Sequence, residues 1–275
     1  GRKQWQAIAA AITIDGNKEL HDSCRLFPDG SPSYDLVAKS MKRHTNYFGT
    51  GMTKLTLAPA NISHAFEAIK NLYEEFHLDG VFANCVYEEG WTTEHGTILY
   101  YQLKQLADWM LNNNIEQDFF CTLFDESIGK PIEVNNVMNY CGGVAGQMLS
   151  FTADGYIQPC LRYTNFCLGG KRPELRVGDL ETGILKREEY LNLAKDMDSI
   201  TRKSQSTEEC FNCPIAYGCG VCLAYNYEKY GTIDKRTTFI CPTHKARVLA
   251  NIYYWNKLYK KYEINKIFPL NIPDK

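Results

Sequence analysis

The first half of the chain alternates between short apolar runs and longer amphipathic stretches. Four stretches of strand length are rich in apolar residues: 10–15, 52–58, 80–86 and 118–124. Three intervening stretches repeat apolar residues at intervals of three and four, which predicts helices: 33–44, 61–76 and 93–113. Strands separated by helices in this way favour βαβ units and a parallel sheet. We therefore predict an α/β fold for this half.

The pattern changes in the second half. Residues 148–160 predict a hairpin that turns at Asp154-Gly155. Helices are predicted over 185–197 and, at the end of the chain, over 243–262. We place a domain boundary near residues 130–140, which divides the chain into 1–135 and 136–275.

Composition narrows the class of protein. The chain is 44% hydrophobic and 23% charged, as in soluble globular proteins. Its formal charge of -2 shows no basic excess, which argues against nucleic acid and anionic membranes as partners. No apolar run approaches the ~20 residues of a membrane span, and the first residues do not resemble a signal peptide. We expect a cytoplasmic protein.

Cysteine usage carries the strongest chemical signal. Disulfides are rare in a reducing cytosol, so the eleven cysteines indicate metal thiolates. Cys-x2-Cys pairs serve both zinc and iron-sulfur clusters. Eight cysteines lie in the second half, and seven of them are candidate metal ligands: Cys141, Cys160, Cys210, Cys213, Cys219, Cys222 and Cys241.

The other four cysteines are weaker candidates. Cys85 and Cys121 lie inside strand patterns and favour a role as small buried apolar residues. Cys24 and Cys167 lie in predicted loops, and their role is open.

Zinc is the alternative to iron. Two four-ligand zinc sites would need eight thiolates, or these seven together with His244. Zinc knuckles often separate their two pairs by a longer loop than the five residues between Cys213 and Cys219. A non-catalytic zinc-binding or cluster-binding module that docks a peptide therefore stays open.

The order of these cysteines resembles the SPASM domain of radical SAM enzymes. Thirteen residues separate Cys141 from Gly155, and four separate Gly155 from Cys160. The run Cys-x2-Cys-x5-Cys-x2-Cys over 210–222 and a final Cys241 complete the pattern, with two residues where the family has three before the last cysteine of the run. The segment AITIDGNKELHDSCRLFPDGSPSYD likewise resembles the middle of a radical SAM barrel.

The resemblance implies an α/β fold in which a partial parallel (β/α) TIM-type barrel over 1–135 precedes a cysteine-rich α+β SPASM domain over 136–275. It also implies two auxiliary 4Fe-4S clusters. The distal cluster would be bound by Cys210, Cys213, Cys219 and Cys241, and the barrel-proximal cluster by Cys141, Cys160 and Cys222. Cys167, another group or a substrate thiolate would complete the proximal set.

The resemblance further assigns residues to S-adenosylmethionine: Thr13, Asp15, Arg25 and Asn61. The loop after the third strand pattern is polar and aromatic, and parallel sheets place their sites at such strand ends. Its candidate substrate contacts are Tyr87, Glu88, Glu89 and Trp91. Simpler explanations exist for both sets, because Asp15-Gly16 suits a turn, Asn61 or Ser63 suits a helix cap, and Thr92 or Thr93 suits another. No catalytic residue is assigned.

The family begins its chemistry at a Cys-x3-Cys-x2-Cys loop that binds a third 4Fe-4S cluster, and this sequence contains no such loop. We expect the chain to be the C-terminal portion of a longer enzyme that does not cleave S-adenosylmethionine by itself. The strand at 10–15 would then be an unpaired edge.

The sequences of the strands and loops are most similar to those of the peptide-maturase branch of this family. This implies a ribosomally synthesised precursor peptide as substrate, with thioether or another cysteine-linked bond as a product, and a reductant such as flavodoxin or ferredoxin. A small molecule or a protein side chain, such as a sulfatase nucleophile, is the alternative substrate. Sulfatase-maturing members carry an Asp base directly after the second SPASM cysteine, where this chain has Leu161.

Overall fold

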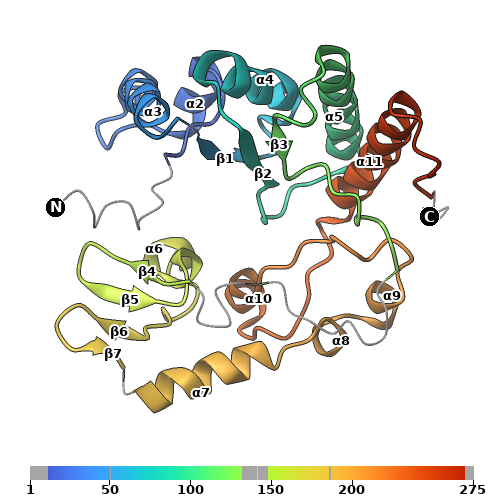
Figure 1. The fold of residues 1–275 in the computed structure, drawn as a ribbon. Helices are drawn as coiled ribbons and strands as arrows, with labels where there is room; N and C mark the ends of the chain where they lie inside the picture. Colours follow the sequence, from blue (N-terminus) through green and yellow to red (C-terminus); the bar gives the residue numbers. More distant parts are fainter. Residues whose placement is uncertain (1–11, 50, 132–140, 142–147, 186, 270–275) are drawn as a thin grey trace. The chain divides into compact units, whose positions relative to one another are not determined.

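The computed structural model describes residues 12–49, 51–131, 141, 148–185 and 187–269. They fall into two compact units (Figure 1). The first contains the described residues up to Val86, then Gly90–Ile128 and those from Cys241 onward. The second contains Tyr87–Glu89 and the described residues of Gly129–Ile240.

The first unit is built on a parallel sheet of three strands in the order β1-β2-β3. The strands are β1 (Met52–Leu57), β2 (Gly80–Cys85) and β3 (Phe120–Cys121). The helices of this unit are α2 (Lys18–Cys24), α3 (Tyr34–Phe48), η1 (Ile62–His64), α4 (Ala65–Phe76), α5 (Thr93–Asn113) and α11 (Cys241–Lys261). The predicted parallel α/β arrangement is confirmed, and α5 has the predicted bounds.

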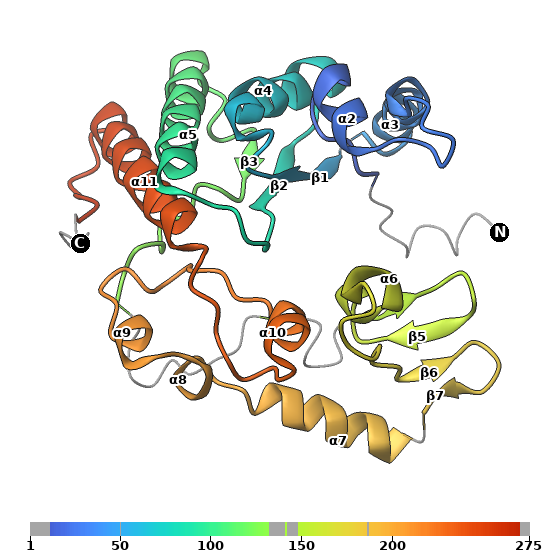
Figure 2. The same cartoon turned by 180° about the vertical axis from the view of Figure 1, so that it is seen from behind.

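Helices cover one face of this sheet, as the two opposite views show (Figures 1 and 2). Alternate strand residues such as Leu55 and Val81 are fully buried, as are Ile69 and Leu72 of α4. This alternation follows from the two-residue period of a strand, which sends successive side chains to opposite faces. The sheet therefore has one apolar face and one that the helices do not cover.

Helix α11 packs along α5, although nearly 130 residues of sequence separate the two helices. A Cβ atom at Gly96 would stand 2.8 Å from the carbonyl oxygen of Pro242, so the absence of a side chain permits this close approach. Asn251 of α11 is fully buried. Its side chain donates to the carbonyl of Leu123 at 2.8 Å and accepts from the backbone N–H of Asp125 at 2.7 Å. One amide thus fixes the loop after β3 onto α11.

The predicted strand at 10–15 differs from the structure. Residues 10 and 11 lie outside the described part, and residues 12–15 form no strand. The hydroxyl of Thr53 on β1 donates to the carbonyl of Ile12 at 2.8 Å and accepts from the N–H of Ile14 at 3.0 Å. Because a side chain takes the place of the backbone ladder, the segment follows β1 without becoming a fourth strand.

His21 organises the segment that follows. Its Nδ1 accepts from the N–H of Asp15 at 3.2 Å, so its proton sits on Nε2, 3.1 Å from Ser33 Oγ. The Ser33 hydroxyl in turn donates to the carbonyl of Arg25 at 2.7 Å. Burial lowers the pKa of His21, Arg25 adds to the effect, and the charges of Asp15 and Asp22 oppose it. The neutral imidazole is therefore the form that fits this chain of hydrogen bonds.

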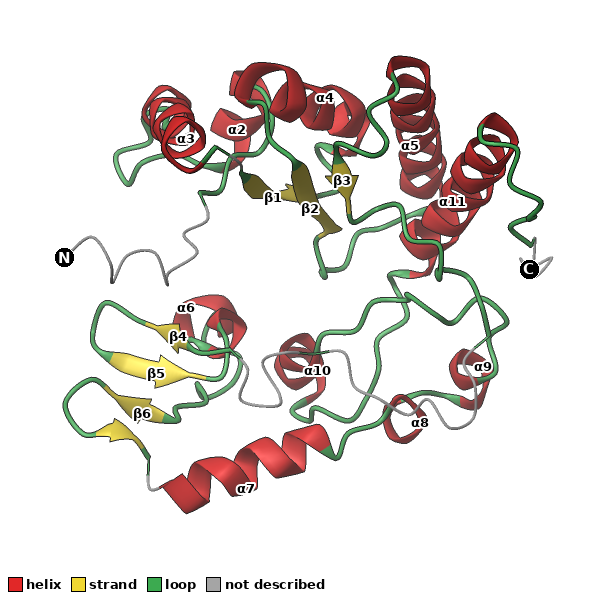
Figure 3. Ribbon diagram, viewed as in Figure 1, coloured by secondary structure: helices red, strands yellow, loops and turns green. Residues whose placement is uncertain are grey.

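The second unit contains a small antiparallel sheet in the order β4-β5-β6-β7 (Figure 3). Its strands are β4 (Ser150–Phe151), β5 (Tyr156–Gln158), β6 (Gly178–Asp179) and β7 (Gly183–Ile184). The predicted hairpin is confirmed, and Gly155 supplies the positive φ of 85° that its turn requires. The helices are η2 (Leu161–Tyr163), α6 (Asn165–Leu168), α7 (Arg187–Asp198), α8 (Arg202–Gln205), α9 (Glu208–Phe211) and α10 (Leu223–Tyr230).

Cys24 and Cys167 are predicted to lie in loops, but both lie in helices. Cys24 ends α2, and Cys167 belongs to α6. Among the described residues, no helix is both long and apolar enough to cross a membrane.

Replacing Asn251 by Ala is expected to lower the free energy of unfolding by about 2–4 kcal/mol, because it leaves the N–H of Asp125 and the buried carbonyl of Leu123 without partners. Thermal unfolding followed by circular dichroism measures the change. Asn46→Ala, at an exposed position of α3, is the control and should be close to neutral. An equal effect of the two variants would contradict the role of Asn251.

Stability should also depend on the protonation of His21. Because the folded pKa of His21 is lowered, the unfolded chain binds its proton first, and stability falls as the pH drops below the ordinary value of 6.5. His21→Asn should melt at a lower temperature near neutral pH but lose less stability between about pH 7.5 and about pH 5.5. His64→Asn, at an exposed position, should retain the pH dependence of the parent chain.

Candidate cofactor and metal-binding sites

Three of the four residues predicted to face S-adenosylmethionine gather at the carboxyl end of β1. The buried carboxylate of Asp15 accepts from the N–H of Thr56 at 3.1 Å and forms an ion pair with Arg25. The amide of Asn61 accepts from the N–H of Ala58 at 2.6 Å and donates to the carbonyl of Thr56 at 3.4 Å. Thr56 therefore links the Asp15–Arg25 pair to Asn61.

The burial of this pair is asymmetric. Asp15 is 1% exposed, whereas the side chain of Arg25 is 41% exposed. The carboxylate thus holds one edge of the guanidinium, and donors remain at the surface for a second anion such as a carboxylate. Thr13, two residues before Asp15, is half-buried. Asn61 is the N-cap residue of η1, but its side chain makes no capping hydrogen bond there.

All four residues predicted to contact the substrate interact with other residues of the chain. Tyr87 accepts from the Thr237 hydroxyl at 2.9 Å, and burial raises its pKa to about 12. Lys229 forms an ion pair with Glu89 at 2.6 Å. Arg162 lies 3.7 Å from Glu88.

Trp91 belongs to the first unit, where it is buried and donates to the carbonyl of Val86 at 3.0 Å. Thr92, which follows it, forms a capping box with His95 and begins α5. The simpler explanation for Thr92 is therefore confirmed.

The uncovered face of the parallel sheet carries side chains that the sequence analysis did not select: Lys54, Thr56, Phe82, Asn84 and Phe120. The register sets Lys54 beside Phe82 and Thr56 beside Asn84, and the rings of Phe82 and Phe120 meet edge to face at 6.0 Å. The signal was present, because a parallel strand covered on both faces would be apolar at every position. This face combines polar and aromatic groups suited to an extended ligand.

Cys141, Cys160 and Cys222 converge in the second unit. All three pack against one small core of buried residues that includes Tyr163 and Leu223. Burial raises the pKa of the Cys160 thiol, and the charges of Cys222 and Cys141 raise it further. The three sulfurs are therefore within electrostatic reach of one another.

Cys222 is also placed by the start of a helix. Its sulfur accepts from the N–H of Tyr225 at 3.4 Å and caps α10. The spacing before Cys222 is one residue shorter than in the family pattern. The structure begins α10 after Cys222, so Gly220 and Val221 lie outside the helix.

Cys210, Cys213 and Cys219 also lie in the second unit. Cys210 belongs to α9, and a turn through Ala216 connects the other two, with hydrogen bonds of 3.1 Å to the carbonyl of Cys213 and 3.2 Å from the N–H of Cys219. The sulfur of Cys219 accepts from Arg236 Nη2 at 3.0 Å. Cys241 opens α11 and belongs to the first unit.

Among the described residues, no group of three or more His, Cys, Asp or Glu side chains is placed to hold a metal ion. The donor set nevertheless fits a 4Fe-4S cluster, which binds each thiolate at a different iron and keeps its ligands farther apart than one ion does. Two buried polar atoms near these cysteines, Tyr163 Oη and Arg236 Nη1, lack a hydrogen-bond partner. Cluster sulfides can accept from such donors.

Cys85 and Cys121 differ from this set. Burial raises the pKa of both thiols to about 11, which disfavours thiolate formation. Their predicted role as apolar core residues is consistent with this environment.

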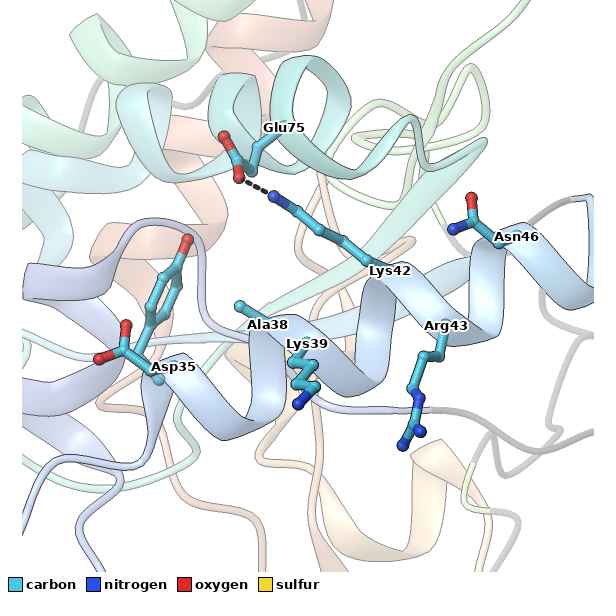
Figure 4. Close-up of a pocket in the computed structure, with 8 residues that line it drawn as sticks. Asp35, Ala38, Lys39, Lys42, Arg43, Asn46 and Glu75 are labelled. Atoms are coloured by element: carbon cyan, nitrogen blue, oxygen red, sulfur yellow. Dashed lines mark hydrogen bonds and ion pairs between the residues drawn. The ribbon is translucent and has the colours of Figure 1, made fainter.

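A surface hollow of about 470 Å³ lies along α3 (Figure 4). Lys42 crosses it to reach Glu75 of α4 at 2.5 Å, and Asp35 at its end pairs with Lys18. It contains none of the predicted site residues.

Comparison with known proteins identifies the fold. Neither protein-family models nor curated proteins give a match. Native anSMEcpe with bound AdoMet and Cp18Cys peptide is similar, with a TM-score of 0.60 and 17% identity over 92% of this chain and 69% of that chain. The histidine-tagged form of anSMEcpe with bound AdoMet gives 0.57 and 18% over 94% of this chain and 69% of that one. The complex with AdoMet and Kp18Cys peptide gives 0.55 and 18%, over 92% and 68%.

anSMEcpe is an anaerobic sulfatase-maturating enzyme of the radical SAM/SPASM type. The resemblance inferred from the cysteine spacing is thus confirmed at the level of the fold. Over nearly its whole length, the chain has the fold of a radical SAM/SPASM enzyme.

Proposed function

We propose that this chain is part of a radical SAM/SPASM enzyme that modifies a ribosomally synthesised peptide. The observation that carries the proposal is the convergence of Cys141, Cys160 and Cys222, from three distant segments, on the core around Tyr163. These are the three residues that the SPASM pattern assigns to one cluster. In this proposal the described first unit is part of a TIM-type barrel, and the sequence divides near residues 130–140.

Two auxiliary 4Fe-4S clusters would supply electron transfer or a binding site for a thiolate. Cys141, Cys160 and Cys222 would hold one of them, and Cys210, Cys213, Cys219 and Cys241 the other. The first set offers three thiolates, so a further group or the sulfur of a substrate cysteine would occupy the remaining iron. Such binding would suit the formation of a cysteine-linked bond in the peptide.

The first unit would bind S-adenosylmethionine at the carboxyl end of β1. Arg25 would pair with its carboxylate, and Asp15 would hold the guanidinium in place. Asn61, fixed by the backbone of Ala58 and Thr56, would offer polar atoms to the ribose. The third cluster of the family would lie outside this chain.

A peptide is the substrate class favoured for the uncovered face of the sheet. The bound peptides in two anSMEcpe structures support this assignment for a chain of the same fold. A sulfatase-type reaction is less favoured, because Leu161 is 62% exposed and a hydrocarbon side chain cannot accept a proton.

Metal analysis of protein purified without oxygen tests the clusters. We expect about eight irons with equal sulfide per chain, because each auxiliary 4Fe-4S cluster holds four irons. Cys160→Ala and Cys213→Ala should each lose about half of this iron, whereas Cys24→Ala, outside the predicted set, should retain it. One or two zinc ions with little iron would instead support a non-catalytic peptide-docking module.

The assignment of Arg25 is tested by ligand binding. Arg25→Gln should weaken S-adenosylmethionine binding by about tenfold or more, since a hydrogen bond to a charged group contributes about 1.5–3 kcal/mol. Equilibrium binding to iron-loaded protein measures the change, with Arg43→Gln on the exposed side of α3 as the control. Unchanged affinity of Arg25→Gln would remove this residue from the site.

A further inference from the structure

Two arginines are buried beside the cysteines of the distal set. Arg202 is 5% exposed and Arg236 is 6% exposed. Arg236 donates to the sulfur of Cys219 at 3.0 Å and to the carbonyl of Gly220 at 2.7 Å. Cys219 and Cys210 both lie within electrostatic reach of Arg202. Both cations therefore face the same group of thiols.

Local structure holds both arginines in place. Arg202 is the first residue of α8, which begins with a capping box between Thr201 and Ser204. The N–H of Arg236 donates to the carbonyl of Gln205, the last residue of α8, at 2.9 Å. The two guanidinium groups are thus fixed near each other by one short helix and one backbone hydrogen bond.

This arrangement is costly unless an anion is present. Burying a charged group without a partner costs several kcal/mol, and two like charges repel. Neither guanidinium forms an ion pair with a carboxylate of the described residues, and Arg202 Nε and Arg236 Nη1 are buried without a hydrogen-bond partner.

We propose that Arg202 and Arg236 form a cationic pair that neutralises the iron-sulfur cluster held by Cys210, Cys213 and Cys219 and raises its reduction potential. This inference rests on the proposed function, because it requires a cluster at these cysteines. A thiolate-bound 4Fe-4S cluster is anionic and gains a further negative charge on reduction. Nearby cations and N–H donors to sulfur stabilise the reduced form more than the oxidised form.

The consequence is a difference between the two proposed clusters. The proximal set lies around Tyr163 and Leu223, an environment of apolar and aromatic groups. The distal set has two fixed positive charges. The pair would make the distal cluster the more readily reduced of the two and would direct an electron from the substrate toward it.

Redox titration followed by electron paramagnetic resonance tests the proposal on the full chain purified without oxygen. Arg202→Gln and Arg236→Gln should each shift one of two couples to a more negative potential, with a tenfold lower ratio of reduced to oxidised cluster at a fixed potential, or about 59 mV for one electron. The second couple should not move. Arg172→Gln is the matched control, since its Nε is also buried without a partner but it packs against Gly231.

Iron content separates the two hypotheses. Parent protein without iron would overturn the proposed function and this inference with it. Full iron in the variants with both potentials unchanged would overturn the arginine pair alone. If a Gln variant does not load its cluster, Arg202→Lys and Arg236→Lys decide, because they keep the charge but lose the guanidinium fork. Restored cluster loading in the Lys variants supports the role of the positive charge, and loading that stays absent overturns it.

Discussion

The second unit can bury only little apolar surface, and this constraint governs how it is held together. Its strands are two or three residues long, and several of its helices, such as α6, α8 and α9, have four residues. Elements of this length bury little surface and gain little from cooperative hydrogen bonding. The cysteines occupy positions where chain segments meet, at the cap of α10 and around Tyr163. In the proposed enzyme, metal ligation at such positions would supply folding free energy that a small core cannot.

The first unit, in contrast, buries a large apolar core. A parallel sheet with helices on one face provides a large core, and the strand ends are free to hold polar groups. Asp15, Arg25 and Asn61 are fixed there by backbone hydrogen bonds around β1, and His21 holds the intervening loop. The fold fixes this strand end, since the buried carboxylate of Asp15 is paired with Arg25.

The two units share one electrostatic feature, because each buries charged side chains and places groups of opposite or complementary charge beside them. In the first unit a buried carboxylate faces a partly exposed guanidinium, which leaves donors for an anionic ligand. In the second unit two buried guanidinium groups face thiols and lack carboxylate partners in the described part of the chain. Each case places a cation where the proposed reaction needs a negatively charged group, the cofactor carboxylate in one and an iron-sulfur cluster in the other.

The sequence by itself determined most of the elements and predicted a chemical class for the site. Periodicity predicted α5 and the parallel strands because burial on one face repeats along the chain, and the Cys-x2-Cys spacing indicated metal thiolates because neighbouring ligands come from one turn. Only the tertiary structure decided the rest: the loss of the strand at 12–15 to the Thr53 hydroxyl, the uncovered face with Lys54 and Phe82, and the position of Arg202 and Arg236 beside Cys219. These features depend on contacts between residues distant in sequence. No local pattern encodes such contacts, because the partner that satisfies a buried polar group is set by packing.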